Sequence, residues 1–240
     1  MAVLLTLGLA APDATAYPEA AATTTSAAVQ QAITGLAGQT VRIRLHRAVT
    51  KLPVAIEKRR GYDRDKFRHW VDANSDCQDT RDEVLDAESV SMVSGCDITT
   101  GEWRSYYDGE VWTHSSDVDI DHLVPLKESW DSGAKSWDAD TRTRYANDLG
   151  DSRTLVAVTD NVNQSKSDRD PAEWMPTYGQ CRYVRQWAAV KIRWGLTVNR
   201  AEKRKLVKVA SGCPDVVLKV TRATVVTSGS SDQTRLARAG

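Results

Sequence analysis

The chain has 240 residues, and its 32 lysines and arginines are matched by 32 aspartates and glutamates, so the net charge does not indicate a nucleic-acid partner. This length is sufficient for one domain with a sizeable hydrophobic core. Beyond the first residues, no apolar stretch reaches the length of a membrane span, and we expect no association with a membrane.

Residues 1–16 are typical of a signal peptide. They contain an apolar run that is too short to span a membrane, followed by Ala14-Thr15-Ala16 as a small-x-small cleavage site. No basic residue precedes the apolar run, so we interpret the leader as truncated and the protein as secreted. The remainder is divided into a flexible segment at 17–40, a domain at 41–215, and a C-terminal extension at 216–240 that is disordered from about 228.

Apolar periodicity and turn residues predict the elements of the domain. Residues 41–52 mix strand and helix signals and stay undecided. In the N-terminal half we predict a helix over 63–71 and strands over 90–93 and 102–107, with Asp108-Gly109 as a hairpin turn. In the C-terminal half we predict a strand from 118 that ends before Pro125, a helix over 139–146, a strand over 155–158, a helix over 161–167 capped by Asp160, and closing helices over 183–194 and 200–209. Asn199 and Glu202 form a capping-box pattern at the start of the last helix.

The four cysteines are Cys77, Cys96, Cys181 and Cys213, and none forms a C-x-x-C motif, which argues against a zinc ribbon. An even number of cysteines in an exported protein favours disulfides. Of the three possible connectivities we favour Cys77–Cys96 and Cys181–Cys213, because each pair brackets a local unit. Four buried free thiols are the alternative.

Charged residues are unevenly distributed along the chain. Residues 182–208 contain nine basic residues against Glu202, and residues 117–131 contain five acidic residues against Lys127. A basic region beside an acidic pocket suits a polyanion bound over a cation. From charge alone, a solvated helix face and an acidic loop remain the favoured explanation.

The run Asp119-Ile120-Asp121-His122 carries the clearest chemistry. Alternate side chains of a strand share a face, so Asp119 and Asp121 point the same way and suit a hard cation such as Mg²⁺ or Mn²⁺. His122 would leave a regular strand on the opposite face, but a turn before Pro125 can bring it alongside as a general base for water. A hydrogen-bonded histidine in an acidic turn is the alternative.

Asn163-Gln164-Ser165-Lys166 lies on the helix predicted after the second strand. An asparagine oxygen can bind a hard metal, and a lysine can contact a phosphate as a point charge. By itself this pattern is weak, because both residue types occur on any solvated helix.

Together these segments resemble the HNH, or ββα-metal, endonuclease signature: Asp121-His122-Leu123-Val124-Pro125, then 155–158, then Asn163-Gln164-Ser165-Lys166. The likeness is greatest to secreted HNH nucleases related to the C-terminal nuclease domain of modification-dependent restriction enzymes, and it covers about 61–213. Other segments that share this likeness are 77–81, 106–109, 130–134, 145–148, 168–176 and 181–183. The resemblance implies an α+β fold whose ββα-metal core, at about 117–168, contains a short antiparallel hairpin, is surrounded by helices and is stapled by disulfides.

The resemblance also implies roles for individual residues. His122 stands at the general base, Asp121 and Asn163 at the metal ligands, and Lys166 at a lysine that acts near phosphate or in structure. Asp119 is an additional ligand or a carboxylate beside the metal. The middle Asn, which orients the base, normally precedes the second strand, but Ser152-Arg153-Thr154 stands there. We assign this role to Asn147, with Asp151 as the alternative.

These roles predict hydrolysis of phosphodiester bonds with little sequence specificity, in DNA and as an alternative in RNA, by a monomer that uses one divalent cation, Mg²⁺ or Mn²⁺. We expect Lys166, Arg81, Arg182 and Arg185 to contact the substrate, with Lys191 and Arg193 as further basic candidates. A metallohydrolase acting on other esters or peptides is the rival enzyme, but the chain contains no H-E-x-x-H motif. A non-catalytic exported binding protein on the same fold is the rival from another class, because the middle Asn is missing.

Overall fold

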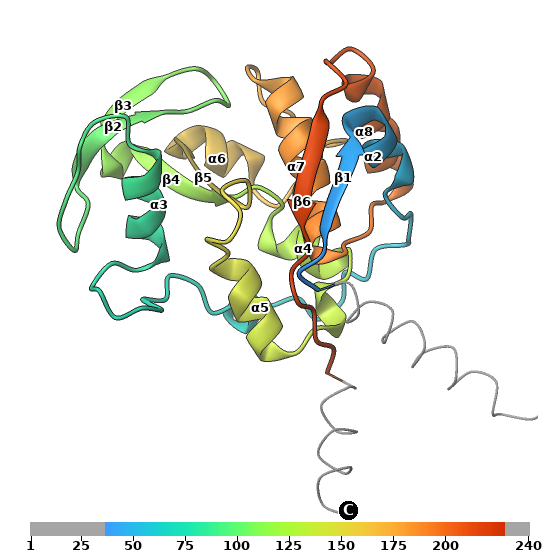
Figure 1. Cartoon of the computed structure of the whole chain (residues 1–240), viewed down its shortest axis with the longest axis horizontal. Helices are drawn as coiled ribbons and strands as arrows, with labels where there is room; N and C mark the ends of the chain where they lie inside the picture. The colour runs from blue at the N-terminus through green and yellow to red at the C-terminus, as the bar shows by residue number, and fades with distance from the viewer. Residues whose placement is uncertain (1–36, 229–240) are drawn as a thin grey trace, which may run out of the picture.

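The computed structural model describes residues 37–228. The expected signal peptide, most of the expected flexible segment and the tail from 229 lie outside these residues. The described part contains helices and three small antiparallel sheets, pairing β1 with β6, β2 with β3, and β4 with β5 (Figure 1). The strands are β1 (Thr40–Arg44), β2 (Thr100–Arg104), β3 (Val111–His114), β4 (Val118–His122), β5 (Leu155–Thr159) and β6 (Val217–Thr221). The helices are α2 (Leu45–Lys51), α3 (Thr80–Glu88), α4 (Leu126–Asp131), α5 (Ala139–Ala146), α6 (Asp160–Lys166), α7 (Gln180–Trp194) and α8 (Arg200–Ala210), with short 3-10 turns η1 (Arg64–Lys66), η2 (Ser115–Asp117) and η3 (Ala134–Ser136).

The β4–β5 ribbon lies between two hydrophobic cores. One of its sides, with Ile120 and Ala157, packs into a smaller core with α3 and β2. Its other side, with Val156 and Val158, packs into a larger core formed by α2, α4, α5, α7, α8 and β6. Every residue of β5 is therefore buried. A ribbon that is covered on both sides gives its side chains fixed directions, which is what a site at its end requires.

The β1–β6 ribbon packs on α7, one of the helices of the larger core. Val41 pairs with Val220 and Ile43 with Leu218, and the exposed residues alternate with these, as expected for a ribbon with one buried face. Leu218 and Val220 are buried in the larger core, so residues 217–221 are part of the packed domain and not of a separate C-terminal extension as the sequence predicts. Within residues 37–228, no helix is long and apolar enough to cross a membrane.

Most elements of the C-terminal half agree with the sequence predictions. The helix over 139–146, the strands of the β4–β5 ribbon and the two closing helices are confirmed, and the capping box of Asn199 and Glu202 is present at α8. Residues 41–52, left undecided, contain both a strand and a helix. Thr159 rather than Asp160 is the residue before α6, and Asp160 is its first helical residue.

Two predictions in the N-terminal half are wrong. The helix over 63–71 is only the 3-10 turn Arg64–Lys66, because the chain extends at Phe67 and Trp70 has a positive φ of 57°. Residues 90–93 form no strand. The helix α3 was missed because only Thr80, Val84 and Leu85 of its nine residues are buried, which is too few for a clear apolar stripe.

The two disulfides join Cys77 to Cys96 and Cys181 to Cys213, the pairing favoured above. The first bridges a segment of the smaller core, across a separation of 19 residues that includes α3. The second joins the start of α7 to the end of α8, across a separation of 32 residues. The region of the smaller core and the α7–α8 pair therefore each contain one disulfide.

Glu88, at the end of α3, makes stability depend on pH. Its carboxylate accepts a hydrogen bond from the Ala157 backbone at 2.9 Å, and burial raises its pKa from 4.5 to about 7, against the opposing effects of this bond and of Arg182. A pKa that is higher in the folded state contributes stability below pH 4.5, and this contribution is lost as the pH rises through about 7. We therefore expect Glu88→Gln, which keeps the acceptor but cannot ionise, to match the wild type at pH 4 and to exceed it by about 3 kcal/mol at pH 8. Urea unfolding at both pH values measures this, with the exposed Glu102→Gln as the control; an equal effect at both pH values would contradict the assignment.

Candidate metal and catalytic site

A cavity of about 290 Å³ opens between the end of β4 and the C-terminal half of α6. Asp121, His122 and Asn163, which the sequence placed in one site, all line it. Asp119 and Asp121 lie opposite Val158 and Val156 of β5, so they share one face of the ribbon as predicted. The other lining residues are Tyr62, Arg64, Ile120, Pro125, Leu126, Lys127, Gln164, Ser167 and Asp168.

Asp121 is a buried carboxylate with one hydrogen bond to each oxygen. Tyr107 donates its hydroxyl to Oδ2 at 2.5 Å, and Lys166 donates its ammonium to Oδ1 at 2.9 Å. Burial raises the pKa of Asp121, while Lys166 and Tyr107 oppose this rise. Each carboxylate oxygen has two lone pairs, so each retains one for a further partner in the cavity.

Asn163 projects from α6 beside the same face of the ribbon. Its side-chain amide donates to Oδ2 of Asp119 at 3.1 Å. This contact turns the amide NH₂ toward Asp119, and it leaves the amide oxygen without a hydrogen bond to a side chain of the described residues. An oriented amide oxygen next to a carboxylate is a donor set that hard divalent cations prefer.

His122, the last residue of β4, is only 5% exposed yet still lines the cavity. One ring nitrogen, Nε2, lies 2.9 Å from the carbonyl oxygen of Ala146. Because a carbonyl can only accept, Nε2 carries the proton and Nδ1 has the free lone pair. Burial lowers the pKa of His122 from 6.5 to about 3, and the bond to Ala146 opposes this only in part. The ring is therefore neutral and able to accept a proton at ordinary pH.

Trp70 covers one face of this imidazole. The two rings stack with centroids 5.6 Å apart and an interplanar angle of 29°. Trp70 also packs against the smaller core, and its backbone adopts the left-handed conformation that few non-glycine residues adopt. His122 is thus fixed between a backbone carbonyl and an indole ring.

Asn147 does not contact His122 in the way expected of the middle Asn. Its side-chain oxygen accepts from the backbone of Val71 and from the Thr80 hydroxyl, and its amide donates to the carbonyls of Arg68 and Thr143. These bonds secure the backbone on both sides of Trp70. The group that orients His122 directly is the carbonyl of the preceding residue, Ala146, which residue types cannot reveal in a sequence.

We expect Asn147→Ala to destabilise the fold by about 2–3 kcal/mol, because several part-buried backbone groups around Trp70 lose their partner. The free energy of unfolding in urea measures this loss. Asn161→Ala on α6 is the matched control, since this side chain is exposed and the change should stay within about 0.5 kcal/mol. If Asn147→Ala lowers the free energy of unfolding no more than this control does, the 68–80 segment does not depend on the Asn147 side chain.

None of the residues predicted to contact substrate lines this cavity. Lys166 is fully buried, and its ammonium contacts Asp121 and the carbonyl of His122, so it secures the strand end and cannot reach a phosphate. Arg81 donates to the carbonyls of Ser115 and Val118, which secures the connection into β4. Arg182 and Arg185 lie on α7 and line a different cavity.

Instead, the basic residues that line the cavity are Arg64 and Lys127. Lys127 forms ion pairs with Asp131 at 2.9 Å and with Asp168 at 3.6 Å, and its side chain remains one-third exposed. Its position two residues after Pro125, the last residue of the motif, could have identified it. Arg64 is distant in the sequence, and no local pattern connects it with the site.

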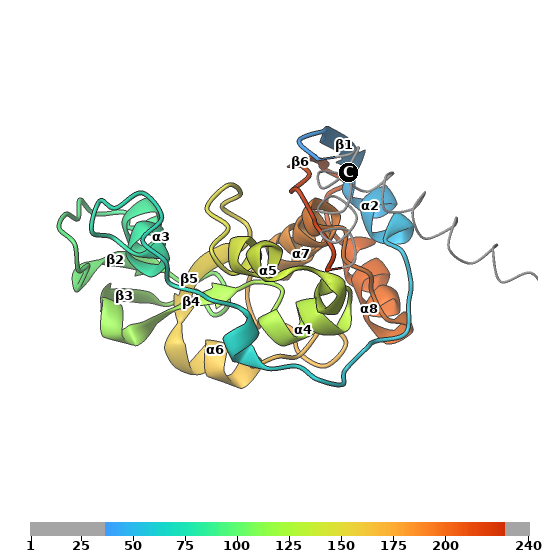
Figure 2. The same ribbon diagram turned by 90° about the horizontal axis from the view of Figure 1, so that it is seen from below.

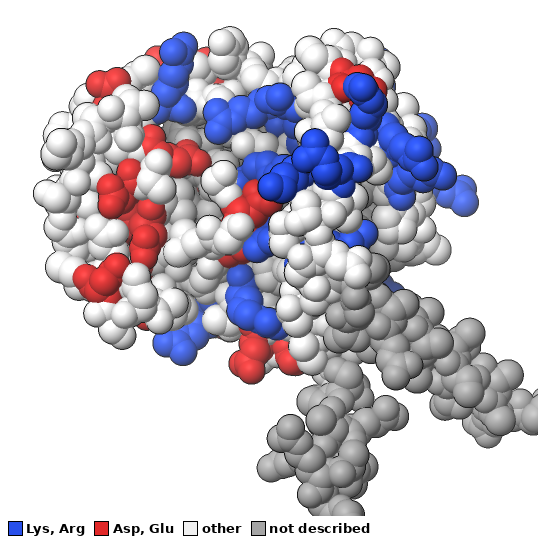
Figure 3. Space-filling model, viewed as in Figure 1, with Lys and Arg blue, Asp and Glu red and all other residues white. Residues whose placement is uncertain are grey.

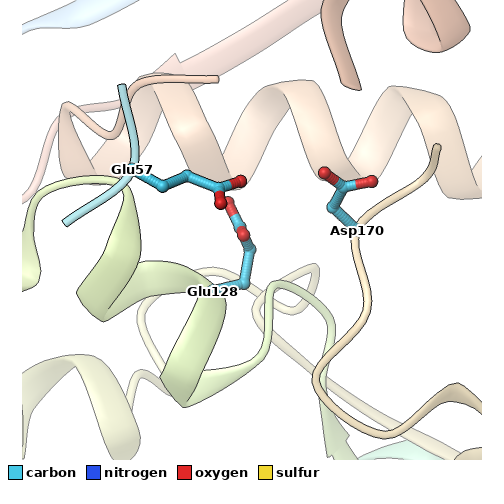
Figure 4. Close-up of side chains that lie close together, drawn as sticks. All are labelled: Glu57, Glu128 and Asp170. Carbon is cyan, nitrogen blue, oxygen red and sulfur yellow. The ribbon is translucent and has the colours of Figure 1, made fainter. Parts of the chain in front are cut away.

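A second acidic group lies outside this cavity. Carboxylate oxygens of Glu57, Glu128 and Asp170 lie within 4.8 Å of one another, and Figure 4 shows the carboxylates of Glu57 and Glu128 directed toward each other, with Asp170 beside them. Asn199 donates to Glu57 at 2.5 Å and to Asp170 at 2.6 Å, and the buried ammonium of Lys191 contacts Glu128. Protein donors therefore already bind each of these carboxylates, and we interpret the group as structural.

Comparison with known proteins identifies the family of the chain. Residues 75–209 match the family described as GmrSD restriction endonucleases, C-terminal domain. The chain therefore belongs to this family and is related to the nuclease domain of modification-dependent restriction enzymes. The match contains α3, the β4–β5 ribbon, α6, α7 and nearly all of α8.

A curated relative from Arthroderma benhamiae is 46% identical over 157 residues, which cover 64% of this chain and 76% of the relative. That protein is described as an uncharacterized secreted protein. With the two disulfides, which persist in oxidising compartments, this places the present protein outside the cell. No solved structure matches the chain significantly.

Proposed function

We propose that this protein is a secreted endonuclease that hydrolyses phosphodiester bonds of DNA with little sequence specificity, and that β4, β5 and α6 form a ββα-metal (HNH) core. The observation that carries this proposal is the meeting of Asp121, His122 and Asn163 at one cavity, with His122 neutral and its Nδ1 unpaired. The family match supports the reaction class. RNA remains the alternative substrate.

The residues present fit a hard divalent cation, Mg²⁺ or Mn²⁺. Asp121 retains a lone pair on each oxygen, and the contact between Asn163 and Asp119 leaves the Asn163 oxygen available. We assign Asp121 and Asn163 as ligands, and Asp119 as the carboxylate that orients Asn163. When bound, the cation stabilises negative charge on the scissile phosphate and on the leaving oxygen.

His122 takes a proton from the attacking water at Nδ1. The Ala146 carbonyl stabilises the remaining N–H at Nε2, and Trp70 excludes solvent from one side of the ring. A neutral imidazole is the form that can accept a proton, and the depressed pKa of His122 maintains it.

Arg64 and Lys127 are the basic residues suited to orient the substrate backbone at this cavity. A contact to phosphate oxygens fixes position but does not read the base sequence. This supports cleavage with little sequence specificity.

The test is nicking of supercoiled plasmid by the purified, disulfide-intact protein with Mg²⁺, with Mn²⁺ and with EDTA. We expect nicking with either ion and none with EDTA, and a parallel reaction with RNA determines the substrate preference. Asn163→Ala should require a higher metal concentration for the same rate. The absence of cleavage with every divalent ion would overturn the function and favour a non-catalytic binding protein.

A further inference from the structure

A second cavity, of about 290 Å³, lies between the first half of α7 and the start of β6. Its basic lining residues are Arg153, Arg182, Arg185 and Lys219, and Gln186 lies among them. No step of the proposed reaction uses these residues.

Three of the four cations in this cavity form no direct ion pair within residues 37–228, although the charge of Arg182 acts on Glu88 at longer range. The guanidinium of Arg182 lies over the Tyr106 ring at 4.1 Å, and Arg185 and Lys219 form no ion pair with a described residue. Only Arg153 is paired, with Asp151. A cavity surrounded by unpaired cations is a site for an anion.

Gln186 adds a neutral donor group to this site. Its side-chain oxygen is buried without a hydrogen-bond partner among the described residues, and the residue is only 8% exposed. Its NH₂ group forms no hydrogen bond with a described residue, so it can donate to an anion in the cavity.

The positive charge continues from this cavity across the β1–β6 ribbon. Arg42 lies opposite Lys219 in the register, and Arg42, Arg44 and Lys219 are on its exposed face. Figure 3 shows basic side chains gathered in a band over α7, β6 and β1, while acidic side chains gather over α3 and the β2–β3 hairpin. We call Arg42, Arg153, Arg182, Arg185 and Lys219 the basic face.

The basic face and the candidate catalytic cavity lie on different sides of the molecule. Figure 2 shows α6 on one side and the β1–β6 ribbon on the other. The two cavities share no lining residue.

We propose that the basic face binds the phosphodiester backbone of a second segment of nucleic acid, without a metal ion. An extended row of cations fits a polymer with regularly spaced negative charges better than it fits a single small anion. This inference rests on the proposed function, because it takes the substrate to be the bound polymer. Such a surface keeps the protein on its substrate while the catalytic site releases one product and engages the next bond.

The test is fluorescence anisotropy of a labelled DNA duplex in EDTA, across a range of salt concentrations. We compare the wild type with Arg182→Glu/Arg185→Glu/Lys219→Glu and with the control Lys58→Glu/Arg60→Glu/Arg200→Glu, which makes the same charge change at exposed residues outside the basic face. We expect the first variant to bind about 10–100-fold more weakly, and to lower the slope of log affinity against log salt by about 2–3, because each phosphate contact contributes about 0.9. The control should change both quantities much less.

Equal affinity and slope for the two variants would overturn the proposal. If the first variant does not fold, Arg42→Glu/Lys219→Glu on the ribbon provides the same comparison with one pair of exposed residues. His122→Ala should bind DNA in EDTA as the wild type does. DNA binding that depends on the basic face, in a wild type that cleaves nothing, would reject the proposed function and keep this inference, whereas cleavage without such dependence would do the reverse.

Discussion

His122→Ala is expected to lower the rate of DNA cleavage by about 10²–10⁴-fold, because a positioned general base contributes this much. The loss should appear in the rate at saturating metal, since the assigned ligands Asp121 and Asn163 are unchanged. Initial rates of plasmid nicking measure it. The variant should remain folded, because its disulfides and both hydrophobic cores are intact.

His114→Ala is the matched control for this experiment. His114 lies in β3 and is exposed, so its removal should leave the rate near that of the wild type. Cleavage by His122→Ala at the wild-type rate would reject the proposed base while leaving the nuclease function in place. Loss of activity in both histidine variants would indicate a general effect on folding instead.

Lys191→Met is expected to lower the free energy of unfolding by about 3–5 kcal/mol. The ammonium of Lys191 is fully buried, and it contacts Glu128 and, at 3.3 Å, Glu202. Burial raises the pKa of both carboxyls, while the charge of Lys191 opposes this rise. Removing the cation leaves two buried carboxylates together without compensation, and Glu57 and Asp170 lie next to them.

Urea unfolding at pH 7 measures this loss, and Lys208→Met on the exposed side of α8 should change stability by no more than about 0.5 kcal/mol. The loss should shrink at pH 5, because protonation then neutralises carboxyls whose pKa is raised by burial. A loss below about 1 kcal/mol at pH 7 would show that water or structural relaxation already compensates these charges.

Much of the candidate site was predictable because its signals are local. Alternation along a strand placed Asp119 and Asp121 on one face, and the order of strand, strand and helix brought Asn163 to them. The closing helices were predictable from their periodicity and capping residues. The residues that the sequence did not connect with the site are Trp70 and Arg64, which reach it from a distant segment with little regular structure. Apolar periodicity carries no information about such a segment.

The basic residues show a related difficulty. Lys166 and Arg182 both looked like phosphate contacts, because a sequence shows charge but not burial. In the structure Lys166 has no exposure and neutralises a carboxylate, whereas Arg182 is exposed on a different side of the molecule from the cavity. A sequence shows which residues carry charge. It does not distinguish charges in buried ion pairs from charges on the surface that are available to a ligand.

The contact between His122 and the Ala146 carbonyl affects how such enzymes can be recognised. A main-chain oxygen is present whatever residue occupies the position, so point substitution at 146 cannot delete the group that orients the imidazole. Under the proposed mechanism, a motif that demands an asparagine before the second strand would reject this chain even though the acceptor is in place. Searches based on the position of that oxygen relative to the histidine ring would therefore find active members that letter-based patterns discard.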